Sequence, residues 1–458
     1  MNWISPDNIR AKFSKLMSEM YQQEVPLYGD LINLVKNINC QVLDKNPILR
    51  KRLELTREYE RLSEERHGAI RLGTAEELAN IARIFAVMGM YPVGYYDLVP
   101  AGVPVHATAF RAVEENSLKL SPFRVFTSLL RLELIDDDHL RKLAEQTLTN
   151  RKIFTSQALS LTEKFEQQGG LEEQDAEVFI NEVLETFRWH TSAPVTKEFY
   201  EKLNAQHRLI ADVVAFRGPH INHLTPRTLD IDEVQKEMIK RDIPAKTIIE
   251  GPPTRECPIL LRQTSFKALE ENVYFQNEVK GEHTARFGEI EQRGVALTPK
   301  GRALYDQLLI STRNKFGGIP TDQNALEYLE LLKEEFKVFP DSYAELQAQD
   351  LAYFYFILEK NPPIKQSLWT EKDLSHLIEQ GFVRIEPIVY EDFLPVSAAG
   401  IFQSNLGNNA QIKYQISSNQ ELFEKQLQRK VLNSFDSYKK VQDASIQTVL
   451  TKINSEKA

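Results

Sequence analysis

Three short segments of the chain contain the residue types that bind divalent metals in proteins. The first contains His67, the second His220 and His223, and the third Glu289 and Glu291. Two histidines and one carboxylate form the ligand set that leaves positions open on Fe(II) for substrate and dioxygen. Zinc or manganese fits these donors nearly as well, so the residues predict a mononuclear metal site without identifying the metal.

The first segment, Arg66–Leu72, has the composition of a β-strand. Alternate side chains of a strand share a face, so His67 and Arg71 point the same way, ~13 Å apart along the backbone at ~3.3 Å per residue. Only the small Ala69 lies between them. This spacing suits a pocket with a metal at one end and an arginine for a substrate carboxylate at the other. A solvent-facing edge strand explains it equally well.

The second segment, residues 217–225, contains two histidines three positions apart. They would be neighbours on a helix and would face opposite sides on a strand. Pro219 and the β-branched surroundings argue against a helix, so we expect only one ligand here. His223 is the better candidate because it lies within the apolar run that leads to Thr225. His220 either supports the ligand or ends the preceding turn.

The third segment, residues 286–294, contains two carboxylates that would share one strand face. Burying Glu289 and Glu291 in a mostly apolar run is costly unless they are paired or bound to a metal. Spacing alone cannot choose between them. A solvated edge strand with Glu–Arg cross-strand pairs is the alternative.

The surrounding pattern predicts one unit twice: a strand, a helix and three further strands. Thr74 and Glu77 form a capping box that opens the first helix, and a second helix is expected over residues 231–240. Further strands are expected over residues 92–98, 103–111, 123–134, 246–250, 259–263, 284–295, 352–358 and 382–389. We expect a helix from Thr298, another over 323–336, and one polar C-terminal helix over 419–441.

The predicted divisions are an N-terminal helical segment (1–65), a first βαβββ module (66–135), a helical insertion (136–212), a second module (213–297) and C-terminal helices and strands completing the core (298–458).

The charge of the chain excludes some functions. With 65 acidic and 56 basic residues the formal net charge is −9, which argues against a general nucleic-acid binder. Two distant cysteines cannot form a disulfide framework. We find neither a signal peptide nor an apolar stretch of the ~20 residues that span a membrane. We therefore expect a cytoplasmic enzyme without a membrane partner; the oligomeric state stays open, and a monomer is compatible with the sequence.

Five ordered blocks of sequence resemble one known family, the 2-oxoadipate dioxygenase/decarboxylase (hydroxyglutarate synthase) family. These blocks are residues 67–74, 88–98, 106–111, 221–227 and 287–294. Their length makes the resemblance specific, and it spans most of residues 15–405.

The resemblance implies an α+β fold, with a vicinal-oxygen-chelate-like core of paired βαβββ modules. These would form a curved mixed sheet around the metal, with extensive helical additions. It also implies that His67, His223 and Glu291 are the metal ligands, and in this way selects Glu291 over Glu289. Arg71 becomes the catalytic clamp for the substrate carboxylate, and Val396 and Ser397 line the substrate pocket.

The reaction implied by the resemblance is conversion of 2-oxoadipate and O2 to 2-hydroxyglutarate and CO2, with Fe(II), in lysine breakdown. Zinc, nickel or manganese could replace iron in a crystal. Three alternatives remain: the same metal site acting on another 2-oxo acid, a non-oxidative zinc or nickel lyase or isomerase, and a non-catalytic metal-containing binding protein. A structural metal would need a closed set of four protein ligands. Three ligands beside an arginine favour an open site.

Overall fold

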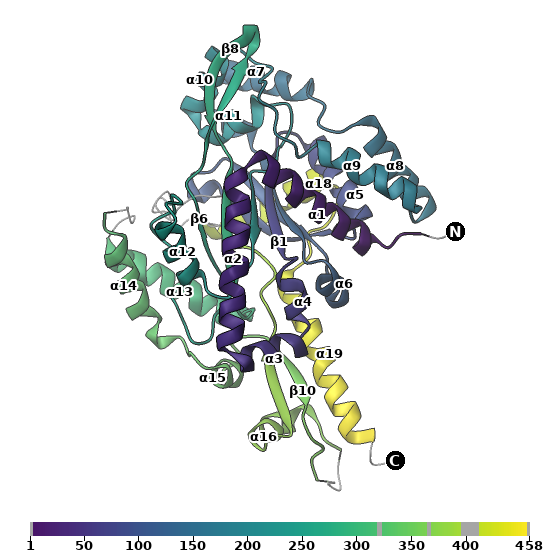
Figure 1. Ribbon diagram of the computed structural model, residues 1–458, viewed down its shortest axis with the longest axis vertical. Helices are drawn as coiled ribbons and strands as arrows, with labels where there is room; N and C mark the ends of the chain where they lie inside the picture. The colour runs from purple at the N-terminus through teal and green to yellow at the C-terminus, as the bar shows by residue number, and fades with distance from the viewer. Residues whose placement is uncertain (1–2, 318–322, 364–367, 395–411, 456–458) are drawn as a thin grey trace.

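The structure is a computed structural model that describes residues 3–317, 323–363, 368–394 and 412–455. Its centre is a seven-stranded mixed sheet that curls into a half-barrel, with strand order β2-β3-β4-β1-β5-β9-β6 (Figure 1). Helices surround the sheet. Within the described residues no helix is both long and apolar enough to cross a bilayer.

One half of the sheet is the first predicted βαβββ module. It consists of β1 (Arg66–Leu72), α5 (Ala75–Val87), β2 (Tyr91–Asp97), β3 (Val105–Arg111) and β4 (Arg124–Leu130). The predicted capping box is present, because the Thr74 side chain accepts from the Glu77 backbone and Glu77 reaches back to the cap. β4 returns parallel to β1 and pairs with it along its length, so this module is confirmed.

The other half repeats this connectivity with β5 (His223–Pro226), α12 (Ile231–Lys240), β6 (Leu261–Ser265) and β9 (Phe287–Arg293). β9 lies parallel to β5, as β4 does to β1, and β6 runs antiparallel to β9. The expected strand at residues 246–250 is reduced to an isolated bridge between Glu250 and Gln263. β1 and β5 pair antiparallel at the centre, where the two modules meet.

A two-stranded hairpin interrupts the second module and was not predicted. Its strands are β7 (Glu270–Phe275) and β8 (Val279–Thr284). The hairpin lies at the top of Figure 1, beside α10 (Lys197–Gln206) and α11 (Arg208–Val214) of the helical insertion. The rest of the insertion consists of α7 (Asp138–Thr149), α8 (Ser156–Gln168) and α9 (Glu173–Glu185).

The chain begins with four helices: α1 (Pro6–Glu24), α2 (Pro26–Lys45), α3 (Pro47–Leu55) and α4 (Glu58–Leu62). Each of the first three has proline in its first turn, where the fixed φ suits the helix and the missing N–H is not needed. α2 runs past the middle of the sheet in Figure 1 and contacts β9 and α12.

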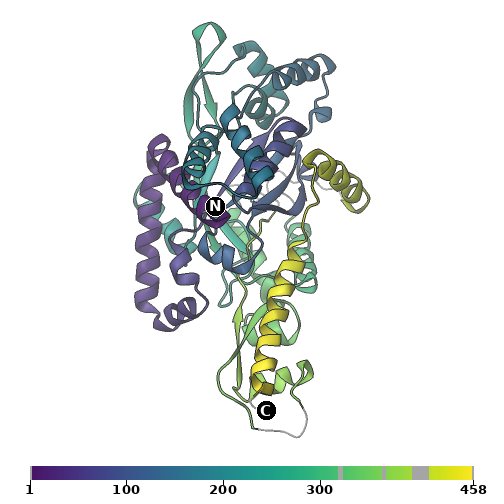
Figure 2. The same ribbon diagram turned by 90° about the vertical axis from the view of Figure 1, so that its right-hand side faces the viewer.

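The C-terminal part lies largely below the sheet. It contains α13 (Pro299–Phe316), α14 (Ala325–Glu335), α15 (Tyr343–Ala348), β10 (Phe354–Leu358), α16 (Leu374–Glu379), β11 (Val383–Pro387), α18 (Ile412–Leu427) and α19 (Ser434–Ser455). β10 and β11 form a separate two-stranded sheet beside α19 (Figure 2). The single helix predicted over 419–441 was wrong, because a break near residue 430 separates two helices.

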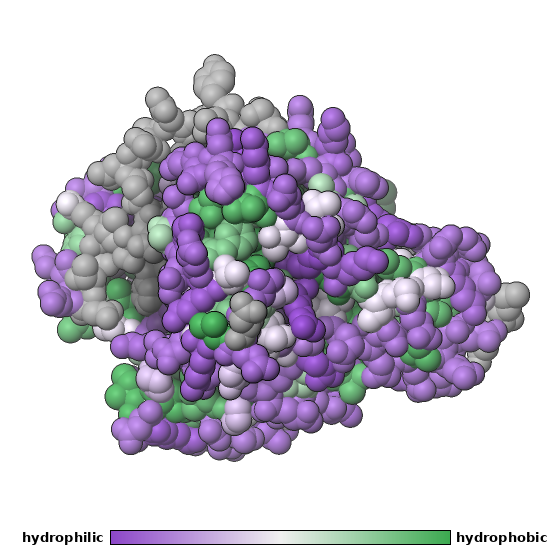
Figure 3. Space-filling view, turned by 90° about the horizontal axis from the view of Figure 1, so that it is seen from above, coloured by the Kyte–Doolittle hydropathy of each residue, from purple (hydrophilic) through white to green (hydrophobic). Residues whose placement is uncertain are grey.

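Each strand of the central sheet has two distinct faces. On the outer face, Ile70, Leu224 and Ile290 pack in a hydrophobic core that the sheet shares with the surrounding helices. On the inner face Ala69 and Phe126 belong to a second core. Hydrophilic side chains cover most of the face seen in Figure 3, and hydrophobic ones form small patches between them. The histidines and carboxylates singled out above lie on the inner side of this sheet.

Candidate metal centre

Three adjacent strands bring two histidines and one carboxylate together. His67 lies on β1, His223 on β5 and Glu289 on β9, and a ligand atom from each lies within 4.8 Å of the other two. The register explains this, since His67 pairs with Thr225 across β1 and β5, and Phe287 with His223 across β9 and β5. All three side chains are buried.

The carboxylate of Glu289 is the centre of this group. Its Oε1 lies 3.0 Å from Nε2 of His67 and 3.7 Å from Nε2 of His223. The same oxygen accepts hydrogen bonds from Thr225 Oγ1 at 3.2 Å and Gln263 Nε2 at 2.7 Å. A buried carboxylate held by neighbouring donors has one orientation, as a metal ligand requires.

The His223 imidazole supports the assignment of a metal here. Its Nδ1 is buried and has no hydrogen-bond partner among the described residues, and its Nε2 is beyond hydrogen-bond distance of Glu289. Burial lowers the pKa of His223 to about 4, so the ring is neutral at neutral pH and can offer a nitrogen lone pair. Two histidines and one carboxylate form a donor set that fits a divalent transition metal.

Glu291, the carboxylate that the resemblance selects as a metal ligand, lies beside His67 but is not part of the group of His67, His223 and Glu289. Its Oε2 is 2.9 Å from Nδ1 of His67, on the side of the ring opposite Glu289. Its two oxygens accept from Nε and Nη2 of Arg293, both at 2.8 Å, and Oε1 is 3.3 Å from Nη1 of Arg124. Glu289 therefore lies close to both histidines, whereas Glu291 lies close to His67 and to the two arginines. The carboxylate of Glu291 faces the Nδ1 edge of the His67 ring, and this nitrogen forms no hydrogen bond with the described residues.

Glu291 is part of a buried network of four carboxylates and four guanidinium groups. The bidentate pair of Arg61 with Glu391, at 2.9 and 3.0 Å, belongs to it. Arg227 also belongs to it, and donates to two carboxylates at 2.6 and 3.0 Å. The full set is Glu58, Glu65, Glu291, Glu391, Arg61, Arg124, Arg227 and Arg293.

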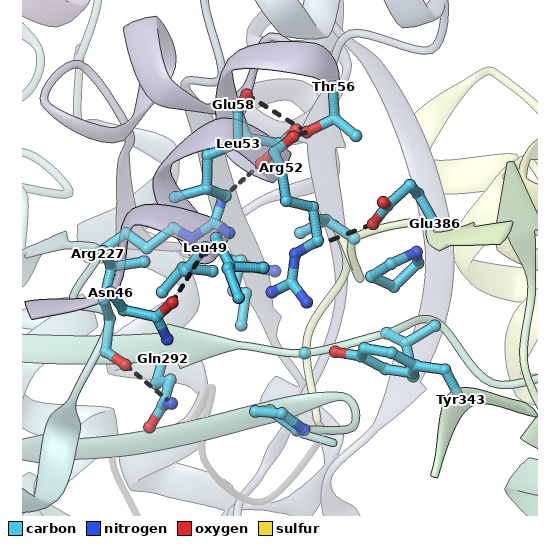
Figure 4. A pocket seen from close by; sticks show the side chains of 18 of the residues that line it. Asn46, Leu49, Arg52, Leu53, Thr56, Glu58, Arg227, Gln292, Tyr343 and Glu386 are labelled. Carbon is cyan, nitrogen blue, oxygen red and sulfur yellow. Dashed lines mark hydrogen bonds and ion pairs between the residues drawn. The ribbon is translucent and has the colours of Figure 1, made fainter. Parts of the chain in front are cut away.

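One edge of this network borders a pocket of about 280 Å³ (Figure 4). Glu58 and Arg227 line it together with Arg52, which lies near Glu386 at 3.8 Å. None of the three residues of the metal group lines this pocket. It is therefore a separate cavity, and the network lies between it and the metal group.

Arg71 occupies the predicted position at the far end of β1 from His67. Its side chain is 18% exposed, and its Nη1 donates to Oδ2 of Asp212 at 2.7 Å. Val396 and Ser397, the other predicted substrate contacts, lie outside the described residues.

Three residues near these sites were not identified from the sequence. Thr225 and Gln263 orient Glu289; Thr225 could have been found because it lies two residues after His223 on the same strand face. Asp212 gave no signal, since it lies within an apolar run. It pairs with Arg71, and its Oδ1 lies 3.3 Å from Nε2 of His220. His220 is thus outside the group of His67, His223 and Glu289, and it lies before β5 begins.

Comparisons with known proteins show the family to which this chain belongs. The family model described as 2-oxoadipate dioxygenase/decarboxylase matches residues 13–405. Proteins of that name from Pseudomonas putida and Escherichia coli K12 are 59% and 55% identical, covering 99% and 97% of this chain and 98% of each relative. A crystal structure of the Pseudomonas putida hydroxyglutarate synthase in complex with 2-oxoadipate matches with a TM-score of 0.91 and 56% identity, covering 99% of this chain and 100% of that one. This chain therefore belongs to the 2-oxoadipate dioxygenase/decarboxylase family.

Proposed function

We propose that this chain is an Fe(II)-dependent enzyme that converts 2-oxoadipate and O2 into 2-hydroxyglutarate and CO2. Family membership supports this proposal, as does a relative whose crystal structure contains 2-oxoadipate. The observation that carries it is the buried group of His67, His223 and Glu289. Such a donor set is typical of iron sites that keep positions open for substrate and dioxygen.

We propose that His67, His223 and Glu289 hold the metal and that Glu291 orients His67. Fe(II) bound there would supply electrons and a template on which the 2-oxo acid and O2 meet. Glu291 lies at the Nδ1 edge of the His67 ring and Glu289 at the Nε2 edge, so Nε2 is the nitrogen that would bind the metal. Phe393 packs edge-on to this ring at 4.9 Å and keeps water from that side of the site.

The substrate needs a cation for its distal carboxylate, and Arg71 is the residue placed to supply it. It lies on β1 four residues from His67, on the same inner face. A guanidinium binds a carboxylate through two parallel hydrogen bonds. With its distal carboxylate bound by Arg71, the substrate would extend its 2-oxo acid end toward His67, His223 and Glu289.

The conversion balances without another reductant. The C1–C2 bond of 2-oxoadipate breaks, C1 leaves as CO2, and the two atoms of O2 end in the new carboxylate and the new hydroxyl group. The substrate supplies all the electrons that O2 accepts. One O2 is therefore expected to be consumed for each CO2 and each 2-hydroxyglutarate formed.

Oxygen uptake by protein reconstituted anaerobically with Fe(II) tests the proposal, with products identified by mass. Uptake that matches CO2 and 2-hydroxyglutarate in equal amounts is the expected result, and the zinc-loaded protein is the control. Uptake only with a different 2-oxo acid would overturn the substrate. A reaction that proceeds with zinc and without O2 would overturn the oxidative chemistry.

A further inference from the structure

A buried chain of hydrogen bonds ends on Arg71. Oδ2 of Asp212 accepts from Arg71 at 2.7 Å, and Oδ1 of Asp212 lies 2.9 Å from Nε2 of His283. Nδ1 of His283 in turn lies 2.9 Å from the hydroxyl of Tyr200. These residues come from β1, α11, β8 and α10, so the helical insertion and the unpredicted hairpin both contribute to it.

The direction of each hydrogen bond follows from the chemistry of Asp212. An ionised carboxylate only accepts, so Nε2 of His283 carries the ring proton and Nδ1 accepts from the Tyr200 hydroxyl. Burial opposes the charge on Asp212, but His220, Arg71 and His283 hold the pKa of its carboxyl well below the usual range. Along these hydrogen bonds, Tyr200 therefore donates to His283, and His283 and Arg71 both donate to Asp212.

Aromatic packing restricts the position of this chain. The Trp189 ring stacks on His283 at 6.2 Å and meets His220 edge-on at 4.6 Å. Phe216 packs against His283 at 4.5 Å. The rings leave little room for the imidazole to rotate, so Asp212 has a fixed partner on the side away from Arg71.

One edge of the Arg71 guanidinium stays available. Nη1 takes part in the bond to Asp212, while Nε and Nη2 form no hydrogen bond within the part of the chain that the structure describes. The side chain is also partly exposed. A substrate carboxylate can therefore bind Arg71 without displacing Asp212.

We propose that the Tyr200–His283–Asp212 chain positions Arg71 and thereby selects the length of the substrate. This inference rests on the proposed function and goes beyond it. Holding the guanidinium at one distance from the metal favours a six-carbon 2-oxo diacid over its five- and seven-carbon homologues. Without Asp212, the long arginine side chain is free to follow a carboxylate that lies nearer or farther.

Asp212→Asn tests this role because asparagine has the shape of aspartate but only one side-chain oxygen that can accept hydrogen bonds. Its amide NH2 group must face a donor, either Arg71 or His283. The measurement is kcat/KM for 2-oxoglutarate, 2-oxoadipate and 2-oxopimelate, together with anaerobic binding of 2-oxoadipate by calorimetry. We expect KM and Kd for 2-oxoadipate to rise by roughly tenfold or more, as for loss of a charged hydrogen bond. We expect kcat to change much less than KM. The preference for 2-oxoadipate over both homologues, measured as the ratio of kcat/KM values, should shrink by about the same factor as KM rises.

Two further variants make the test specific. Tyr200→Phe removes only the hydroxyl that fixes the His283 tautomer and should produce a smaller change in the same direction; it carries the test if Asp212→Asn does not fold. Asp232→Asn is the matched control, because Asp232 also pairs with an arginine, Arg262, at 2.6 and 3.0 Å but takes no part in the Tyr200–His283–Asp212 hydrogen bonds. It should leave KM and the length preference unchanged.

The possible results separate this inference from the proposed function. A wild-type protein that turns over none of the three acids would overturn both. A wild-type protein that selects 2-oxoadipate, with variants that keep the same length preference, would overturn the positioning role alone. Equal losses with all three acids would assign Asp212 a merely structural role.

Discussion

At the scale of single residues, two groups of the proposed metal centre owe their protonation states to their surroundings. Burial lowers the pKa of His223 to about 4, which leaves its ring neutral. Burial alone would raise the pKa of Glu289, but His223 and His67 outweigh it and lower this pKa. Both groups are therefore in the forms that bind a divalent cation at neutral pH, and binding at these two positions needs no proton release.

Arg71→Lys tests the two-point contact expected for the distal carboxylate. Lysine keeps the positive charge but loses the planar pair of donors. We expect kcat/KM for 2-oxoadipate to fall by roughly 10–100-fold, equivalent to about 1.4–2.7 kcal/mol, with metal content unchanged. Oxygen uptake measures this, and Arg262→Lys is the control. Wild-type efficiency in Arg71→Lys would rule out the clamp.

Residue-scale prediction worked where strand alternation alone decides the outcome. His67 and Arg71 share a face, and the structure places both on the inner side of β1. Alternation cannot separate Glu289 from Glu291, because they also share a face. Their partners decide: Thr225 and Gln263 donate to Glu289, whereas Arg124 and Arg293 bind Glu291. These partners lie on β5, β6, β4 and β9, so only the folded sheet reveals the difference.

At the scale of elements, the metal centre depends on close packing beneath β1 and β5. A Cβ on Gly68 would lie 2.6 Å from Cδ1 of Ile221 and 3.1 Å from the backbone oxygen of His223. To relieve these contacts, the Ile221 side chain would have to move and the His223 backbone to yield by a few tenths of an ångström. Glycine at position 68 therefore helps to set the distance between the two ligand-bearing strands.

Gly68→Ala is expected to reduce the free energy of unfolding by about 1–3 kcal/mol, the usual cost of overpacking. It should also weaken metal binding, because the His223 backbone must move. Thermal unfolding and metal titration measure these effects. Gly29→Ala in α2 is the matched control: its nearest atom would be 4.0 Å away, and alanine favours a helix by about 1 kcal/mol. Unchanged stability and metal affinity in Gly68→Ala would contradict this account.

Elements with a strong local signal were predicted, and those without one were missed. The helix opened by the capping box of Thr74 and the helix expected over residues 231–240 were both predicted correctly. In the hairpin of β7 and β8, exposed and buried residues alternate only over residues 272–275, and β8 buries no apolar side chain, so the signal of a half-buried strand is short. Helix α11 is a short apolar run, which periodicity cannot distinguish from a buried strand.

At the scale of the whole molecule, the buried ion network joins parts of the chain that are far apart in sequence. Arg61 belongs to α4, Arg124 to the first module, Arg293 to the second and Glu391 to the C-terminal part. Removing one partner of a buried pair leaves an uncompensated charge, which costs about 3–5 kcal/mol. We expect Glu391→Gln to destabilise the fold by an amount in this range.

The network should make stability fall at acid pH. Burial alone would raise the pKa of Glu391, but Arg61 and Arg124 lower it from 4.5 to about 2. A lowered folded-state pKa contributes stability that is present above the unfolded value and is lost as the pH falls. Urea unfolding of the metal-free protein should therefore show stability falling between about pH 4.5 and 2. Glu391→Gln should show a shallower fall, and an identical pH profile in both proteins would contradict the assignment.

Metal binding by the two carboxylate variants tests the central claim most directly. Anaerobic Fe(II) titration should give one bound ion per wild-type chain. Glu289→Gln should abolish this stoichiometric binding, while Glu291→Gln should still bind one ion with affinity reduced by roughly 10–100-fold, as expected for a residue that orients a ligand. Full affinity in Glu289→Gln together with loss of the ion in Glu291→Gln would contradict the assignment of His67, His223 and Glu289 as the metal site.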